Sequence, residues 1–285
     1  MSRARFCVAA VVTLAAVTIN GSAASARSAP NDRTGATQTL DIQAADFSFE
    51  APATLPAGRT RVVLHNANGT EPHQAALVKL NDGVTTSDYL TALAQSFTAA
   101  EAKGTLLGGP NAAGPGHDSG VVVDLKPGNY AVLCLIPSPD GTPHVLKGMM
   151  RDLTVTDAGA KQKSKAKKLP ALALSEYQFK LPRELGRGAV EIVNKGKEAH
   201  EAVIAKLAPG KTVKDIVDWV TPIFVPAPGP QPYEDVGGTT PMSPGTRVRL
   251  DTRLPTGKYL LLCFIPDPSG TSHLKLGMIH PFTVR

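Results

Sequence analysis

Sulfur and imidazole side chains recur with one spacing at two places in the chain. Within 134–149 a cysteine is followed after nine residues by a histidine and after four more by a methionine, and 263–278 repeats this order. Nine of the sixteen residues are identical, at a constant offset of 129. A further histidine lies upstream of each segment, in a matching Gly-x-Glu-x-His run. The candidate metal ligands are therefore His73, Cys134, His144 and Met149, then His200, Cys263, His273 and Met278.

This combination of residue types favours copper. A soft thiolate, two imidazoles and a weak thioether form the ligand set of a blue-copper electron-transfer site, whereas zinc sites are built from Cys, His and carboxylates. Other interpretations stay open. The two cysteines could be buried core residues or form one disulfide. The methionines could be packing residues, with Met150 in place of Met149 as the axial group, and His73 and His200 could cap strands.

The similarity extends upstream of both cysteines and predicts two domains. A Gly-Gly pair recurs at the offset of 129, and the first histidine recurs at an offset of 127. The stretch 157–169 contains five lysines and no aromatic or β-branched residue, which is typical of an exposed linker. We therefore predict a first repeat at 40–156 and a second repeat at 170–285.

Each repeat has the pattern of a β-sandwich. Short apolar or alternating runs lie between turn residues, and the continuous apolar runs 130–136 and 259–265 predict strands buried on both faces. One helix is expected in each repeat, over 85–102 and 212–220, with Thr85 or Ser87 and Thr212 as N-caps. The predicted fold class is all-β, two tandem Greek-key sandwiches with one short helix each.

The N-terminus predicts export. Arg3 and Arg5 precede an uncharged apolar run of thirteen residues at 7–19, shorter than the ~20 residues that span a bilayer. A small-residue site ending at Ala26 follows, so residues 1–26 are expected to be a cleaved signal peptide. A membrane anchor is the alternative. Residues 27–39 are expected to be flexible, and the mature protein periplasmic or secreted.

Both repeats resemble the cupredoxins, in which an upstream His and a Cys-His-Met loop bind type 1 copper. The resemblance implies a cupredoxin sandwich around one such copper site in each repeat. It also implies that His144 or His273 approaches the surface as the electron port. A small amide near the first histidine often bonds the cysteine sulfur in this family, whereas Gln74 and Glu201 stand here. Glu71, Glu198 and Glu201 could orient ligand imidazoles, or be surface residues.

The sequence predicts no catalytic residue. Two-domain copper nitrite reductases and small laccases connect a second copper through a histidine beside the cysteine, whereas leucine or phenylalanine flanks both cysteines here and no His-x-His occurs. We therefore expect electron transfer and no enzyme activity. The alternatives are a copper carrier or storage module, and a divergent copper oxidoreductase with a site made from His117 and His280 across a subunit interface. His65, like these two, has no counterpart in the other repeat.

The charge does not favour nucleic acid as a partner. Of the formal charge of +6, the first repeat contributes −4 and the second +3, and the remainder lies in the predicted signal peptide, N-terminal segment and linker. Nucleic-acid binding would require a basic face. The expected partners are a redox protein or a copper donor; no further window is long enough to span a membrane, and nothing in the sequence indicates an oligomeric state.

Overall fold

The computed structural model describes residues 37–158, 168–222 and 225–285. The predicted signal peptide 1–26, most of the segment 27–39 and most of the linker 157–169 lie outside these residues. Among the described residues, no helix is long and apolar enough to cross a membrane.

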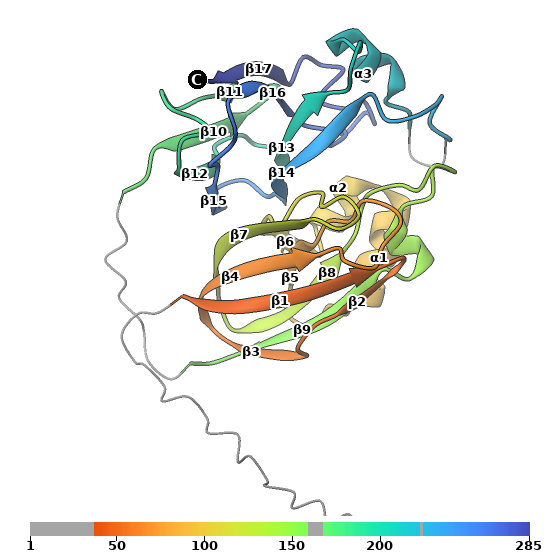
Figure 1. Cartoon of the computed structure of the whole chain (residues 1–285). Helices are drawn as coiled ribbons and strands as arrows, with labels where there is room; N and C mark the ends of the chain where they lie inside the picture. Colours follow the sequence, from red (N-terminus) through yellow and green to blue (C-terminus); the bar gives the residue numbers. More distant parts are fainter. Residues whose placement is uncertain (1–36, 159–167, 223–224) are drawn as a thin grey trace, which may run out of the picture. The chain divides into compact units, whose positions relative to one another are not determined.

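The first repeat is a sandwich of two sheets (Figure 1). One sheet has the order β2-β1-β4-β7 and the other β3-β9-β8-β5-β6. The strands are β1 (Gln38–Ala45), β2 (Ser48–Glu50), β3 (Thr54–Pro56), β4 (Gly58–His65), β5 (Ala76–Leu80), β6 (Gly104–Leu106), β7 (Asp118–Leu125), β8 (Gly128–Leu133) and β9 (Met150–Thr156).

The second repeat builds the same sandwich. Its sheets have the orders β11-β10-β12-β15 and β14-β13-β16-β17. The strands are β10 (Ala171–Ser175), β11 (Gln178–Lys180), β12 (Ala189–Asn194), β13 (His200–Leu207), β14 (Tyr233–Met242), β15 (Arg247–Asp251), β16 (Gly257–Leu262) and β17 (Ile279–Val284). The prediction of an all-β fold with two sandwiches is confirmed.

Burial follows the sequence pattern. In β1 every second side chain is buried, which is expected of a strand with one face on the core. The last four residues of both β8 and β16 are buried without alternation. These two strands therefore lie inside their sandwiches, as their continuous apolar runs predict, and each leads directly into the cysteine of its repeat.

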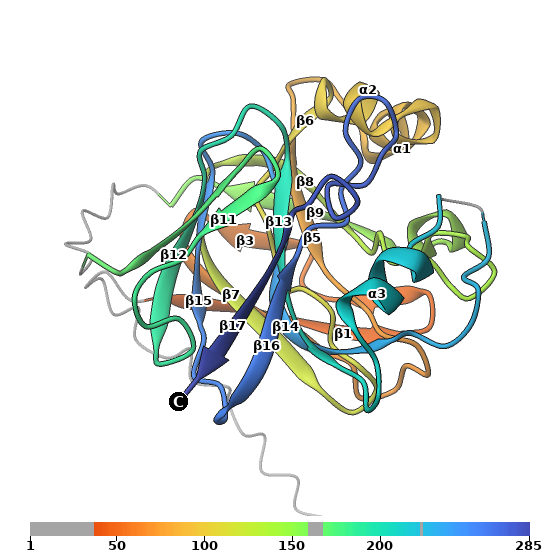
Figure 2. The same ribbon diagram turned by 90° about the horizontal axis from the view of Figure 1, so that it is seen from above.

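The helices begin where the sequence predicts. Thr85 caps α1 (Thr86–Gln95) and Thr212 caps α3 (Val213–Trp219), each in a capping box with an aspartate three residues later. The helix expected over 85–102 is interrupted at Ser96, whose extended backbone ends α1 and caps α2 (Phe97–Glu101). The first repeat thus has two short α-helices instead of one. Figure 2 shows the helices beside the sandwiches.

The repeated Gly-Gly pairs permit a close backbone approach. A Cβ atom at Gly109 would lie 2.0 Å from the Ala75 carbonyl oxygen, and one at Gly238 would lie 2.0 Å from that of Ala202. Ala75 and Ala202 each follow the first histidine of their repeat by two residues. Only glycine therefore lets the neighbouring segment lie against the chain that carries this histidine.

The two repeats contact one another inside one compact unit, Thr34–Arg285. Val122 of β7 pairs with Arg249 of β15, which joins one sheet of each repeat into an eight-stranded sheet. The Asn111 side chain also donates to the Thr239 carbonyl oxygen at 3.0 Å.

Candidate metal centre

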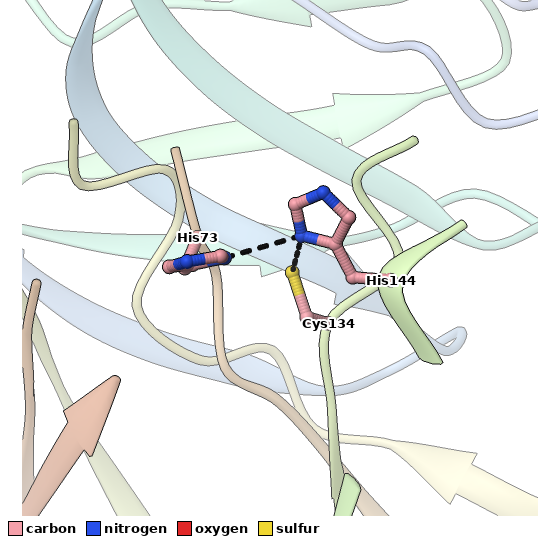
Figure 3. Close-up of side chains that lie close together, drawn as sticks. All are labelled: His73, Cys134 and His144. Carbon is pink, nitrogen blue, oxygen red and sulfur yellow. Dashed lines mark hydrogen bonds between the residues drawn. The ribbon is translucent and has the colours of Figure 1, made fainter. Parts of the chain in front are cut away.

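Three ligand-type side chains of the first repeat converge in its interior (Figure 3). The Nδ1 atoms of His73 and His144 are 3.1 Å apart, and the Cys134 Sγ lies 3.4 Å from the His144 Nδ1. All three residues have no solvent exposure. Their ligand atoms lie within 4.8 Å of one another, a grouping that could hold a metal ion.

The second repeat reproduces this cluster. The Nδ1 atoms of His200 and His273 are 3.1 Å apart, and the Cys263 Sγ lies 3.5 Å from the His273 Nδ1. These three residues are also fully buried and within 4.8 Å of one another. Both cysteines are free, so the alternative of a disulfide between them is wrong.

Backbone hydrogen bonds fold the cysteine loop back on itself. The Cys134 N–H donates to the Met149 carbonyl oxygen at 3.2 Å, and the Met149 N–H donates to the His144 carbonyl oxygen at 3.0 Å. His144 begins the 3₁₀-helix η1 (His144–Lys147), and Gly148 ends it with a φ of +102°. Met149 is fully buried, whereas Met150 is 41% exposed, so Met149 is the methionine inside the sandwich. The second repeat has the same bonds between Cys263, His273 and Met278.

Burial keeps the thiols and imidazoles of both clusters in their neutral forms. It raises the pKa of the Cys134 thiol to about 12 and raises that of Cys263 further. It lowers the pKa of His144, and lowers that of His200 to about 4. Neutral imidazoles are the form that binds metals, and a bound cation displaces the thiol proton.

In the first repeat, a carboxylate forms a hydrogen bond with the Nε2 atom of each imidazole. The His73 Nε2 lies 2.9 Å from Asp46, and the His144 Nε2 lies 2.9 Å from Glu71. Burial opposes ionisation of Asp46, but hydrogen bonds from Thr70 and His73 lower its pKa to about 2. A carboxylate can only accept, so each Nε2 carries the hydrogen.

The donor set of the first repeat fits a cation. With both Nε2 atoms protonated, the two neutral rings direct Nδ1 lone pairs at one another across 3.1 Å, beside a buried sulfur. Facing acceptors repel in a low-dielectric interior unless a cation or a proton lies between them. A metal ion satisfies both lone pairs and the thiolate at once.

The second repeat differs at its first histidine. The His273 Nε2 contacts Glu198 at 3.0 Å, as His144 contacts Glu71. The His200 Nε2, however, lies 4.0 Å from Glu176 and has no hydrogen-bond partner.

Main-chain amides contact both sulfur atoms. The Gln74 N–H lies 3.5 Å from the Cys134 Sγ, and the Glu201 N–H lies 3.4 Å from the Cys263 Sγ. Because the donor is the backbone, the side chain at this position is free to vary. The Glu201 carboxyl is 5% exposed and accepts the Phe264 N–H at 2.8 Å.

A buried asparagine in each repeat anchors the segment before the first histidine. The Asn66 side chain donates to the Glu71 and Ala113 carbonyl oxygens, both at 2.8 Å, and accepts the Gly69 N–H. Asn194 makes matching bonds in the second repeat. Sequence reasoning missed both residues, because their offset of 128 matches neither the upstream nor the downstream alignment of the repeats.

We expected the cysteine-loop histidine of each repeat to approach the surface. His144 and His273 have no solvent exposure. The Phe47 ring packs edge-on against His144 and the Tyr177 ring against His273, both with centroids 5.0 Å apart. Phe47 and Tyr177 lie in the β1–β2 and β10–β11 turns with φ of +69° and +60°, a left-handed conformation that is strained for an aromatic residue.

The remaining histidines lie outside these clusters. The His65 ring contacts Asp118 at 2.9 Å and Asp41 at 3.2 Å, while His117 and His280 are exposed. In the part of the chain that the structure describes, neither His117 nor His280 belongs to a metal-type cluster.

Comparisons with known proteins give matches among solved structures. No family model and no curated protein matches the chain. A reduced auracyanin from Roseiflexus castenholzii matches 43% of this chain and 99% of its own, at 20% identity and a TM-score of 0.31. A copper-containing nitrite reductase from Thermus scotoductus matches 87% of this chain and 61% of its own, at 14% identity and a TM-score of 0.23. A blue copper oxidase from Nitrosomonas europaea matches 83% and 82%, at 13% identity and a TM-score of 0.27.

The matches over both repeats correct one prediction. They include a nitrite reductase and multicopper oxidases, so the expectation that the chain is not an enzyme was wrong. The lack of a histidine beside Cys134 or Cys263 does not exclude an enzyme. The chain itself consists of two β-sandwiches in tandem.

Proposed function

We propose that the chain is an exported copper protein with two type 1 sites that transfer electrons. His73, Cys134, His144 and Met149 would hold one copper ion, and the matching set His200, Cys263, His273 and Met278 the other. Copper in such a site supplies reversible one-electron exchange between Cu(I) and Cu(II). We also propose that the repeats 40–156 and 170–285 are separate domains and that residues 1–26 are a cleaved signal peptide.

One observation carries this proposal. Two imidazole Nδ1 atoms and one thiol converge, fully buried, at the same place in both sandwiches. The buried methionine that follows each histidine favours copper over zinc, because a thioether is a ligand of copper sites. The backbone hydrogen bonds that join Cys134, His144 and Met149 would hold these ligands in one geometry in both oxidation states.

Copper counting tests the proposal. The mature protein loaded with Cu(II) should bind about two copper ions and show an intense blue absorption, the signature of a copper–thiolate site. Cys134→Ser and Cys263→Ser should each remove one copper and about half of the absorption, and the double variant should be colourless.

Other results would assign another function. A colourless protein that still takes up Cu(I) would support a copper carrier. Turnover of nitrite or a phenol by the copper-loaded protein would make it an oxidoreductase. Retention of both coppers in the double variant would contradict the proposed sites.

A further inference from the structure

In each repeat, one Glu-x-His segment contains the first histidine of the cluster and also contacts the second. In the first repeat, Glu71 stands two residues before His73 but its side chain bonds to His144, 2.9 Å away on the cysteine loop. In the second, Glu198 stands two residues before His200 and bonds to His273 at 3.0 Å. The Glu-x-His segment therefore provides one histidine of the cluster, and its glutamate carboxylate forms a hydrogen bond with the other histidine.

We propose that Glu71 and Glu198 are positioning residues that fix the tautomer and orientation of His144 and His273 and stabilise the Cu(II) state of each site. This inference rests on the proposed copper sites. It assigns a role to two acidic residues outside the ligand set, each bonded to an imidazole that has no solvent exposure.

Burial distinguishes these pairs from surface ion pairs. The imidazoles are fully buried, and the carboxylate side chains are only 25% and 29% exposed. An exposed pair contributes little because water screens it. Here the hydrogen bond lies mostly out of water, and the Phe47 and Tyr177 rings pack against the same imidazoles.

The backbone beside each glutamate is held in place. The Asn66 side chain donates to the Glu71 carbonyl oxygen at 2.8 Å, and Asn194 donates to that of Glu198 at the same distance. Both asparagines are fully buried. These hydrogen bonds hold the backbone of each glutamate in place. The carboxylate can therefore orient the neighbouring imidazole ring.

The bond has two chemical consequences. Because the carboxylate accepts from Nε2–H, the Nδ1 lone pair of His144 is free and faces the Cys134 sulfur at 3.4 Å. The negative charge also makes the imidazole a stronger donor. A more charged metal ion gains more from both effects, so Cu(II) should be stabilised more than Cu(I).

The test isolates one site. In the full chain with Cys263→Ser, we would compare Glu71→Gln, Glu71→Ala and the control Glu50→Gln, whose exposed side chain lies on β2. Imidazole ¹⁵N NMR of the metal-free proteins reports the His144 tautomer, and voltammetry of the copper-loaded proteins reports the potential. Glu198→Gln in the Cys134→Ser background repeats the experiment independently in the second repeat.

Specific results are expected. Loss of a carboxylate behind a metal-bound histidine typically weakens metal binding 10- to 100-fold, and Glu71→Gln should weaken Cu(II) binding by that factor with a smaller loss for Cu(I). Each tenfold difference between the two oxidation states raises the potential by 59 mV. Glu71→Ala should in addition mix the two His144 tautomers.

Two results would overturn the inference. One is a potential and a His144 spectrum in Glu71→Gln that equal those of Glu50→Gln. The other is a parent protein whose His144 carries its hydrogen on Nδ1. If the parent takes up no copper, the proposed function fails, and the NMR comparison of the metal-free proteins alone then decides whether Glu71 positions His144.

Discussion

Replacement of Glu201 by glutamine should change the pH dependence of folding in the metal-free protein. The Glu201 carboxyl is 5% exposed and lies near Asp235 and Tyr233. Burial raises its pKa from the ordinary 4.5 to about 7; the Phe264 N–H opposes the shift, and Asp235 adds to it. Each pKa unit is worth about 1.4 kcal/mol, so ionisation of this buried carboxyl costs the folded state about 3 kcal/mol.

The sign follows from the two pKa values. Above pH 4.5 the carboxyl of the unfolded chain loses its proton, while that of the folded protein keeps it until about pH 7. The unfolded state is therefore favoured progressively over this interval. The stabilising contribution of Glu201 is complete below pH 4.5 and is lost as the pH rises through about 7.

Urea unfolding followed by tryptophan fluorescence measures this effect. Trp219 is the single tryptophan and packs against Tyr233 at 5.8 Å between ring centroids, so it reports on the second repeat. The free energy of unfolding of the wild type, minus that of Glu201→Gln, should fall by about 3 kcal/mol between pH 4.5 and about pH 7. Glu184→Gln, at an exposed position of the same repeat, is the control for the substitution itself. A flat or rising difference for Glu201→Gln would refute the reasoning.

Three further predictions concern stability. Asn66→Ala removes three hydrogen bonds, two of them buried and one partly buried. It should lower the free energy of unfolding by about 3 kcal/mol in calorimetry; a loss below 1 kcal/mol would contradict the anchoring role. Gly238→Ala places a Cβ 2.0 Å from the Ala202 carbonyl oxygen. It should lower the free energy of unfolding by at least ~2 kcal/mol and disturb the second copper site, which would be measured as lower copper uptake. Normal uptake and stability would show that the close approach is unnecessary. Hydrogen bonding to Asp41, opposed by burial, raises the pKa of His65 above the ordinary 6.5. The contribution of His65 to stability is therefore complete below pH 6.5 and declines as the pH rises through the raised value. His65→Gln should remove this decline, measured as the urea midpoint at increasing pH, and an unchanged pH profile would count against it.

The sandwiches and the two clusters could be predicted because the chain contains two similar repeats, which can be compared with each other. His73 and Cys134 stand out only because His200 and Cys263 repeat their types and order. The buried strand before each cysteine follows from its continuous apolar run. The sequence also predicted Thr85 or Ser87 as the first N-cap and Thr212 as the second, and the structure has Thr85 and Thr212.

The surroundings of the clusters could not be predicted in the same way. Phe47 and Tyr177 reach the histidines from a hairpin turn about a hundred residues away in sequence, through a positive φ that the residue type does not indicate. The complete burial of His144 and His273 was therefore not predicted. The Asn66 side chain forms hydrogen bonds with main-chain groups of other residues, and such contacts produce no periodic pattern in the sequence.

The most direct test of the central claim is a crystal structure of the copper-loaded protein with anomalous data collected across the copper edge. Two copper peaks should appear, one between the Nδ1 atoms of His73 and His144 beside the Cys134 sulfur, and one at the matching place in the second repeat. Peaks at His65, His117 or His280 instead, or empty clusters in copper-saturated crystals, would contradict the account.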